Sequence, residues 1–528
     1  MIWRSSSTPS AARPRKSDRR IRSTNTGTER CLGPLREPAP HVHHRRRPSI
    51  PRQEHPPPSG QQGLARPPVA AVLARPRNPV GNATRRASRG QPSGAEESRR
   101  LRRHAVLLAD RTRSLRFCLF PSETYRGRAQ LQTYRGYLER EIEMLRPWFA
   151  GDEVTSVYFG GGTANLYPAA DYPELPRLVE RLTGVPLSAT AELTLEGIPQ
   201  LFTRDKVAAI KDGGFTRVSM GVQQIDDDMI ALSGRKQTAK HVWQTVEWCA
   251  ELGLSLSVDL IFGWPNQTEA RMVADLERVI AAGVRHITHY ELNVAGRSDF
   301  ARNHRDALPS IEDNQHLYQV AKQLLSQAGY RQATVYDWEK ADDDRARYRF
   351  EEDLHRTFYA DGETLRGNEM LGLGYAGVCN LPGTPDDPGL TYFNHTNLDA
   401  YFEALDAGRW PVERGFSFAA EDLRLVWLFQ TMQTLRIDTD QYRRVFGSEL
   451  RTDFGVEVQA IEEREWALQE GTQLRIIGPG ELMVPTIQAL FAARRTDALR
   501  RGASAPPPGM KAARRAGRRE GPVRLPVC

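Results

Sequence analysis

Three polar side chains, Glu196, Gln223 and Asp259, stand at or near the ends of runs of residues typical of buried β-strands. A fourth run, VYFGGGT over residues 157–163, ends in glycines, which let the backbone come close to a ligand. Taken singly, each polar residue is more simply explained as a loop group or a helix cap. Their recurrence at successive strands favours convergence on one polar ligand, because the carboxyl ends of parallel strands share one edge.

The residues between these runs have the pattern of helices. The strand-like runs cover residues 191–196, 217–224, 255–265 and 285–292, and the helical patterns cover residues 205–211, 239–252 and 269–282. This alternation is typical of a parallel sheet with crossover helices. We therefore expect an α/β fold, an incomplete (β/α) barrel over residues 105–345, followed by a smaller, mostly helical C-terminal domain over residues 346–492 with a buried helix at 422–435.

Charge divides the chain into three parts. Residues 1–104 contain about 23 Lys and Arg against 6 Asp and Glu, residues 493–528 about 10 against 2, and the middle about 40 against 57. Low hydrophobic periodicity and many Pro and Ser residues predict a disordered Arg/Pro-rich segment at 1–104, and charge predicts a basic disordered tail at 493–528. Because the middle is acidic, no nucleic-acid partner is expected.

The first segment, residues 1–104, has three interpretations. It is an arm that binds nucleic acid or anionic surfaces, a transit peptide, or the translation of a wrong reading frame in GC-rich DNA. The wealth of Arg, Pro, Ala and Ser favours the wrong reading frame. Elsewhere, no apolar run reaches the length of a membrane span, and the cysteines show no disulfide spacing, so we expect a protein of the reducing cytoplasm.

Several segments together resemble one family. VYFGGGT, LTLEGIP, RVSMGVQQ, LSGR and VDLIFGWPNQT occur in this order, and DLHRTFYADGETLRGNEMLGLGYAG follows at residues 353–377. They resemble the radical S-adenosylmethionine (SAM) proteins of the oxygen-independent coproporphyrinogen III oxidase family, which includes heme chaperones and related methyltransferases. The resemblance covers residues 117–492 and implies two cofactors, SAM and a [4Fe-4S] cluster.

The resemblance also implies which residues contact SAM. The glycine turn would line the methionine end of SAM through Gly161, Gly162 and Thr163, and the further contacts would be Glu196, Gln223, Arg235 and Asp259. These residue types suit the ligand. Glycines expose backbone amides to a carboxylate, a guanidinium pairs with that carboxylate bidentately, and acidic side chains bind an ammonium group and ribose hydroxyls.

The cluster motif departs from the family. Three cysteines in a C-x3-C-x2-C loop hold the cluster in radical SAM proteins, but this chain has only Cys118, in the third position. Arg111 and Leu115 stand where the other two belong, and LRRHAVLLAD at 101–110 replaces the family's preceding strand. The remaining cysteines, Cys31, Cys249, Cys379 and Cys528, have no metal-site spacing. The pattern begins abruptly at Phe117, as a frame error just upstream would produce.

With a complete cluster, the resemblance implies reductive cleavage of SAM to methionine and a 5′-deoxyadenosyl radical. The radical would act on a tetrapyrrole or related substrate, with flavodoxin or ferredoxin as a possible electron donor. Phe120 replaces a fourth cysteine of the oxidase, a pattern closer to the heme chaperones and methyltransferases. A non-catalytic protein that carries heme is the alternative of another class. Tyr290, His289 and Tyr336 are candidates to face the substrate, although packed aromatic and histidine side chains explain them more simply.

Overall fold

The computed structural model describes residues 100–106, 123–161, 163–292, 294, 298–351, 358–360, 365–367 and 369–503. For residues 100–106, 358–360, 365–367 and 502–503 only the backbone is described. All of these residues belong to one compact unit, residues 57–528.

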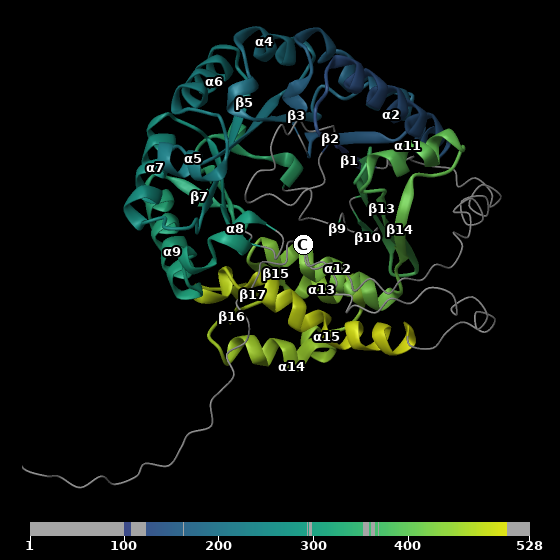
Figure 1. The fold of residues 1–528 in the computed structure, drawn as a ribbon. Coiled ribbons are helices and arrows are strands. Elements are labelled where there is room, and N and C mark those ends of the chain that lie inside the picture. Colours follow the sequence, from purple (N-terminus) through teal and green to yellow (C-terminus); the bar gives the residue numbers. More distant parts are fainter. Residues whose placement is uncertain are drawn as a thin grey trace, which may run out of the picture. The chain divides into compact units, whose positions relative to one another are not determined.

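A 12-stranded sheet runs through this unit in the order β14-β13-β12-β11-β1-β2-β3-β4-β5-β6-β8-β7 (Figure 1). The strands from β11 through β6 in this order are parallel, and the strands at either end are antiparallel. In chain order the first eight are β1 (Arg100–Val106), β2 (Glu153–Gly160), β3 (Glu192–Gly197), β4 (Arg217–Gln223), β5 (Ser255–Phe262), β6 (His286–Glu291), β7 (Tyr330–Gln332) and β8 (Asp337–Lys340). The sheet is open, as the sequence predicts for an incomplete barrel.

Helices connect the parallel strands and cover one face of the sheet (Figure 1). They are α2 (Arg128–Phe149), α3 (Glu174–Thr183), α4 (Arg204–Asp212), α5 (Asp227–Ser233), α6 (Ala239–Glu251), α7 (Glu269–Ala281), α8 (Asp299–Asn303) and α9 (Ile311–Gln327). Side chains cap several of them: Thr203 and Thr268 accept the backbone N–H three residues on, and Ser310 forms a capping box with Asp313. The helical patterns at 205–211, 239–252 and 269–282 are therefore confirmed.

The two faces of the sheet differ in chemistry. Val157 pairs with Leu193, Leu195 with Val218, and Met220 with Val258, and all six side chains are buried in the core under the helices. Side chains alternate along a strand, so the residues between them point to the opposite face. That face, which we call the inner face, carries polar residues from β2 to β8. The fold thus places its apolar core under the helices and its chemistry on the other side.

The C-terminal region joins this sheet before it becomes helical. It contributes β11 (Glu369–Leu373), β12 (Val378–Thr384), β13 (Asp387–Asn394) and β14 (Val412–Ser417), with β9 (Phe358–Ala360) and β10 (Leu365–Gly367) as a separate pair. Its helices are α11 (Leu398–Asp406), α12 (Ala420–Gln433), α13 (Thr439–Phe446), α14 (Leu450–Glu462) and α15 (Val484–Ala503). A small sheet of β15 (Arg436–Asp438), β16 (Ala467–Glu470) and β17 (Gln473–Ile476) lies among the last of them.

Two expected boundaries differ from the structure. Helix α15 continues to Ala503, so a disordered tail does not begin at residue 493; its buried Phe491 and Ala492 belong to the core, and the helix carries on from them. Strand β1 begins at Arg100, inside the segment expected to be disordered, and it pairs with both β2 and β11. Residues 1–99 and 504–528 lie outside the described residues. Of the helices that are described, none is long and apolar enough to cross a membrane.

Candidate functional site

The strand register brings the predicted acidic residues to the inner face. Glu196 pairs with Ser219 across β3 and β4, and Asp259 pairs with Gly221 across β4 and β5. Ser219 and Gly221 are two residues apart, so they point to the same side, and their partners Glu196 and Asp259 do so too. Asp259 lies inside β5, three residues before its end, because the neighbouring strands are staggered. The expected convergence of these two carboxylates is found.

The glycine turn after β2 closes against Glu196. The backbone N–H of Gly161 donates a 2.7 Å hydrogen bond to Oε2 of Glu196, and Gly161 has a φ of 99°, a conformation that favours glycine. Gly160 has no room for a side chain, because a Cβ there would overlap both Glu196 Oε2 and the ring of Tyr158. Thr163 is buried at the start of the short helix that follows, and Gly162 lies outside the described residues.

Gln223, the last residue of β4, and Arg235, in the segment after α5, lie at the same edge. Gln223 has a φ of 68°, unusual for a residue with a side chain, and its buried Oε1 has no hydrogen-bond partner. The guanidinium of Arg235 donates to the carbonyl of Gly221 and, at 3.0 Å, to Gln237 Oε1. A buried amide oxygen without a hydrogen-bond donor and a strained backbone are both features of ligand-binding sites.

Electrostatics couple these groups. Burial raises the pKa of Glu196, while the Gly161 N–H, a hydrogen bond from Tyr158 and the charge of Arg235 oppose the rise. Burial raises the pKa of Asp259 well above its usual range, Glu196 adds to the rise, and Arg235 opposes it. One guanidinium thus faces two carboxyl groups, so ionisation of both leaves negative charge around Arg235 that is not compensated. A cationic ligand would relieve it.

These groups fit SAM. The excess negative charge of Glu196 and Asp259 suits an ammonium group or ribose hydroxyls, and the orphaned oxygen of Gln223 suits a hydrogen-bond donor of the ligand. The guanidinium of Arg235 suits a carboxylate, while the N–H of Gly161 is donated to Glu196. The site residues predicted from the sequence and described by the structure therefore lie together, on the edges of β2 to β5.

The chain is similar to proteins of known family. The profile of the radical SAM superfamily matches residues 116–279. The oxygen-independent coproporphyrinogen III oxidase of Helicobacter pylori (strain ATCC 700392 / 26695) is 26% identical over 341 residues, covering 63% of this chain and 72% of the relative. The corresponding protein of Escherichia coli (strain K12) is 28% identical over 315 residues, covering 58% of this chain and 66% of the relative. Residues 116–279 are thus a radical SAM domain, in a chain that is similar to these oxidases.

The fold is also similar to that of a solved structure. Coproporphyrinogen III oxidase (HemN) from Escherichia coli, a radical SAM enzyme, superposes with a TM-score of 0.64 over 75% of this chain and 91% of that chain, at 20% sequence identity. The open α/β sheet of this radical SAM protein, extended by a C-terminal region, is thus the fold of a solved structure. The relatives named here are oxidases, so they do not favour the heme chaperone or the methyltransferase that Phe120 suggested.

Radical SAM proteins bind a [4Fe-4S] cluster, and the donor set of this chain does not fit one. Cys118, Arg111 and Leu115 lie outside the described residues, but their residue types supply one thiolate where three are needed. Cys249 is buried in α6, where burial raises its pKa to about 12. Cys379 is buried in β12, and its thiol donates a hydrogen bond to the carbonyl of Gly372. Within the described part of the chain, no group of His, Cys, Asp and Glu residues could hold a metal ion.

The candidate substrate-facing residues divide between the two faces. His289 pairs with Leu260, on the helix side, where its ring lies 4.9 Å from that of Phe262 and burial lowers its pKa to about 3. It is a packed core histidine and does not face the inner side. Tyr290 points to the inner face, is 38% exposed, and lies with its ring 5.5 Å from that of Tyr336.

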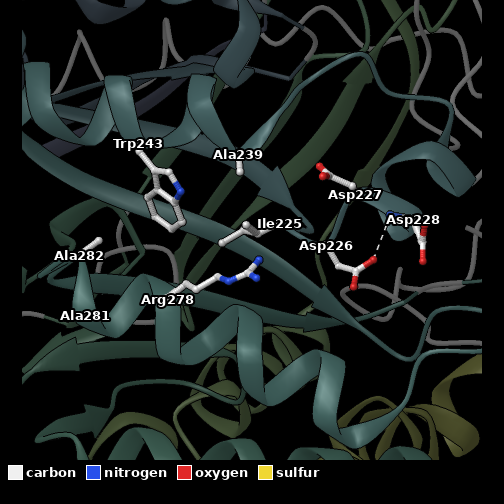
Figure 2. Close-up of a pocket in the computed structure, with 9 residues that line it drawn as sticks. All are labelled: Ile225, Asp226, Asp227, Asp228, Ala239, Trp243, Arg278, Ala281 and Ala282. Atoms are coloured by element: carbon white, nitrogen blue, oxygen red, sulfur yellow. Dashed lines mark hydrogen bonds between the residues drawn. The ribbon is translucent and has the colours of Figure 1, made fainter. Parts of the chain in front are cut away.

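A hollow of about 770 Å³ lies elsewhere, on the helix side (Figure 2). Its lining includes Asp226, Asp228, Trp243 and Arg278, from the segment before α5 and from α5, α6 and α7. None of the residues that meet around Glu196 lines it. Since the strained backbone, the orphaned oxygen and the coupled carboxylates all lie on the inner face, we place the site there.

Two residues of the site were not among the sequence predictions. Tyr158 and Gly160 alternate along β2, and the pairing of Tyr158 with Thr194 puts both on the face of Glu196. The signal was present in the run VYFGGGT, where every second residue from Tyr158 points the same way. It could be used only once the register between β2 and β3 was known.

Proposed function

We propose that this chain is a SAM-binding protein of the coproporphyrinogen III oxidase type, with a tetrapyrrole or a related molecule as its substrate. The observation that carries the proposal is the meeting of Glu196, Arg235 and Asp259 beside Gly161 on the inner face. The oxidase names of the relatives support the substrate class.

The methionine end and the ribose of SAM have counterparts in this site. Gly161, Gly162 and Thr163 would line the methionine end, and Arg235 would pair with its carboxylate. Glu196 and Asp259 would take the ammonium group and the ribose hydroxyls, and Gln223 would accept a hydrogen bond through its orphaned oxygen. Bound SAM supplies a source of the 5′-deoxyadenosyl radical in this family; the residues named here bind and orient it.

The chain as printed should bind SAM without cleaving it. Cleavage requires an iron with an open position, held by three thiolates, and the motif supplies only Cys118. The oxidase activity, and with it an electron donor such as flavodoxin or ferredoxin, belongs to a chain with cysteines at positions 111 and 115. The reducing cytoplasm, which suits unpaired cysteines, is part of the same proposal.

The decisive test is calorimetric titration with SAM. We expect Glu196→Ala and Asp259→Ala each to weaken binding roughly ten- to a hundredfold, because a hydrogen bond to a charged group contributes about 1.5 to 3 kcal/mol. The titration is made on the full chain and on its Arg111→Cys/Leu115→Cys variant loaded with iron and sulfide, in which SAM should bind more tightly.

Asp228→Ala is the matched control. Asp228 is an exposed carboxylate that lines the hollow on the helix side, so its loss should leave the affinity for SAM unchanged. Weakening by Asp228→Ala, with Glu196→Ala and Asp259→Ala unaffected, would move the site to that hollow. Absence of SAM binding in both chains would refute the proposal.

A further inference from the structure

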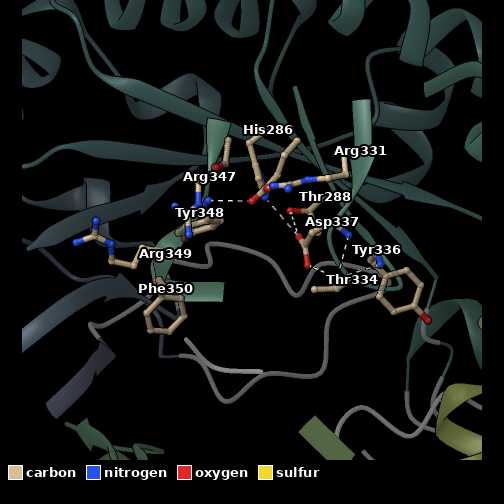
Figure 3. Close-up of polar contacts among 12 residues, drawn as sticks. His286, Thr288, Arg331, Thr334, Tyr336, Asp337, Arg347, Tyr348, Arg349 and Phe350 are labelled. Carbon is tan, nitrogen blue, oxygen red and sulfur yellow. Dashed lines mark hydrogen bonds and ion pairs between the residues drawn. The ribbon is translucent and has the colours of Figure 1, made fainter. Parts of the chain in front are cut away.

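A short segment runs along the amino ends of the strands on the inner face. Residues 345–350, which we call the strap, follow β8 and precede the C-terminal region (Figure 3). The strap contacts the first residues of several strands: the carbonyl of Arg345 accepts from Ser255 Oγ at 3.3 Å, and the Tyr348 ring lies 5.0 Å from that of His286. It therefore lies at the opposite edge of the sheet from the glycine turn.

A buried ion pair fixes the strap. Arg217, 2% exposed, pairs with Glu192 at 3.3 Å and donates to the carbonyl of Arg347. Its guanidinium lies 4.5 Å from the centre of the Tyr348 ring. Glu192 in turn accepts the backbone N–H of Phe350 at 3.0 Å. Because both ends of the ion pair hold strap backbone, the position of Phe350 is determined by the strands.

Phe350 contacts Tyr158, and Tyr158 reaches the SAM site. The two rings are stacked, with centres 5.0 Å apart and planes 28° from parallel. One edge of the Tyr158 ring and the carboxylate of Glu196 both lie next to Gly160, so close that a Cβ on Gly160 would overlap both. Hydrogen bonding from the Tyr158 hydroxyl also lowers the pKa of Glu196, against the rise that burial causes. The ring of Tyr158 thus bridges the strap and a carboxylate of the SAM site.

We propose that Tyr158 is a positioning residue for Glu196 and that Phe350 of the strap holds Tyr158 in place. The inference rests on the proposed SAM site and deepens it. The hydroxyl of Tyr158 keeps the Glu196 carboxylate aimed beside the Gly161 N–H, and stacking on Phe350 removes the alternative orientations of the tyrosine ring. The strap, far along the chain, thereby sets the affinity of the site.

Four groups act on the ionisation of Glu196. Tyr158 and the Gly161 N–H reach it from β2 and its turn, Arg235 from the segment after α5, and Asp259 from β5. The first three favour the carboxylate, and the negative charge of Asp259 opposes it. Removing the Tyr158 hydroxyl leaves the other three in place, so Glu196 should take up a proton at higher pH.

The test is Tyr158→Phe in the full chain, titrated with SAM between pH 5.5 and 8.5. The stacked ring stays and the hydroxyl goes, so we expect SAM to bind about three- to tenfold more weakly near neutral pH, the range for loss of one hydrogen bond. Loss of binding on the acid side should begin at higher pH than in the unchanged chain. Phe350→Leu, which keeps the hydroxyl but removes the stacking, should weaken binding in the same direction.

Tyr401→Phe is the matched control. Tyr401 donates a 2.8 Å hydrogen bond to the buried carboxylate of Glu141, away from the inner face, so this variant also removes a tyrosine hydroxyl from a buried carboxylate. It should lower the melting temperature while the affinity for SAM and its pH profile stay unchanged. Phe350→Tyr, which retains the stacked ring, should bind SAM as the unchanged chain does.

The outcomes separate the two proposals. If the unchanged chain binds SAM and Glu196→Ala does not, but Tyr158→Phe and Phe350→Leu match the unchanged chain in affinity and pH profile, the positioning role is wrong and the SAM site stands. If the unchanged chain does not bind SAM, both are wrong. If Tyr158→Phe does not fold, Phe350→Leu decides, since it leaves Tyr158 and Glu196 intact.

Discussion

Asp259 illustrates how a residue of the proposed site can weaken the fold that carries it. Burial raises its pKa well above the usual range, the charge of Glu196 raises it further, and Arg235 compensates only in part. The carboxylate is therefore held in a place where, without a ligand, its charge is unfavourable. Sites that bind charged ligands commonly retain such residues at the expense of stability.

Asp259→Asn should stabilise the protein in the absence of SAM. A carboxyl whose pKa is raised by folding binds its proton more tightly in the folded state, so the free energy of unfolding falls as pH rises from the unfolded pKa to the folded one. Asparagine does not titrate. We expect the melting temperature of Asp259→Asn to exceed that of the unchanged chain at pH 8 and the difference to shrink at pH 5.

Asp313→Asn is the control, and its effect on the melting temperature should have the opposite sign. Hydrogen bonds from Ser310 lower the pKa of Asp313, so its contribution to stability is present above the unfolded pKa and is lost as pH falls. Its replacement should lower the melting temperature at pH 8. A lower melting temperature for Asp259→Asn at pH 8 would show that its charge is already compensated in the free protein.

Among the elements, β3, β4 and the strap depend on one ion pair. Arg217 and Glu192 stand at the first positions of neighbouring strands, and Arg217 also bonds Ser257 Oγ at 3.0 Å. The same inner face holds Asp337, which accepts from Thr288 at 2.8 Å and from Thr334 at 2.5 Å (Figure 3). Polar networks of this kind are stable only while each buried member keeps its partners.

Arg217→Ala should therefore cost about 3 to 5 kcal/mol in the free energy of unfolding, because it leaves a carboxylate with little access to water and no cation. Chemical denaturation measures the change. Arg140→Ala is the matched control, since its ion pair with Asp406 is exposed, with side chains 57% and 54% accessible, and should contribute under about 1 kcal/mol. Equal losses in the two variants would show that the ion pair does not hold the strap.

For the whole molecule, the position of β1 is in conflict with its sequence. The strand lies between β11 and β2, inside the parallel part of the sheet, where strands are normally apolar. Its sequence, RLRRHAV, contains three arginines and a histidine. The superfamily profile begins only at residue 116, just after the positions of the missing cysteines. A frame error upstream of codon 117 explains both observations.

We expect resequencing of the DNA upstream of codon 117 to reveal a frame shift. The corrected frame should encode two cysteines at the positions now occupied by Arg111 and Leu115, and a more apolar strand in place of RLRRHAV. A confirmed frame that retains Arg111 and Leu115 would contradict this prediction, and the chain would then be a natural radical SAM protein without a cluster motif.

The cluster itself can be tested in the protein. After anaerobic treatment with iron and sulfide, the printed chain should lack a stoichiometric [4Fe-4S] centre and form no 5′-deoxyadenosine from SAM under dithionite, because one motif thiolate cannot hold four irons. Arg111→Cys/Leu115→Cys should bind about four irons per chain and form 5′-deoxyadenosine. About four irons per chain in the unchanged protein would show that other side chains replace the two missing thiolates.

The sequence by itself determined the fold class and predicted the residues of the proposed site. Alternating strand and helix patterns are local properties, so helices such as α4, α6 and α7 could be predicted within one or two residues. Glu196, Gln223, Arg235 and Asp259 were found because a motif fixes residue type and spacing, and the structure brings them together. The lack of cluster cysteines at positions 111 and 115, which are Arg and Leu, is likewise visible in the sequence alone.

Only the tertiary structure decided what surrounds those residues. The face to which a strand residue points depends on register, which placed His289 under the helices and Tyr158 and Gly160 beside Glu196. The strap reaches Tyr158 from almost two hundred positions along the chain, a contact that no local pattern encodes. The C-terminal strands join the large sheet in the same way, because β11 pairs with the distant β1 and backbone hydrogen bonds between strands carry no trace in either sequence by itself.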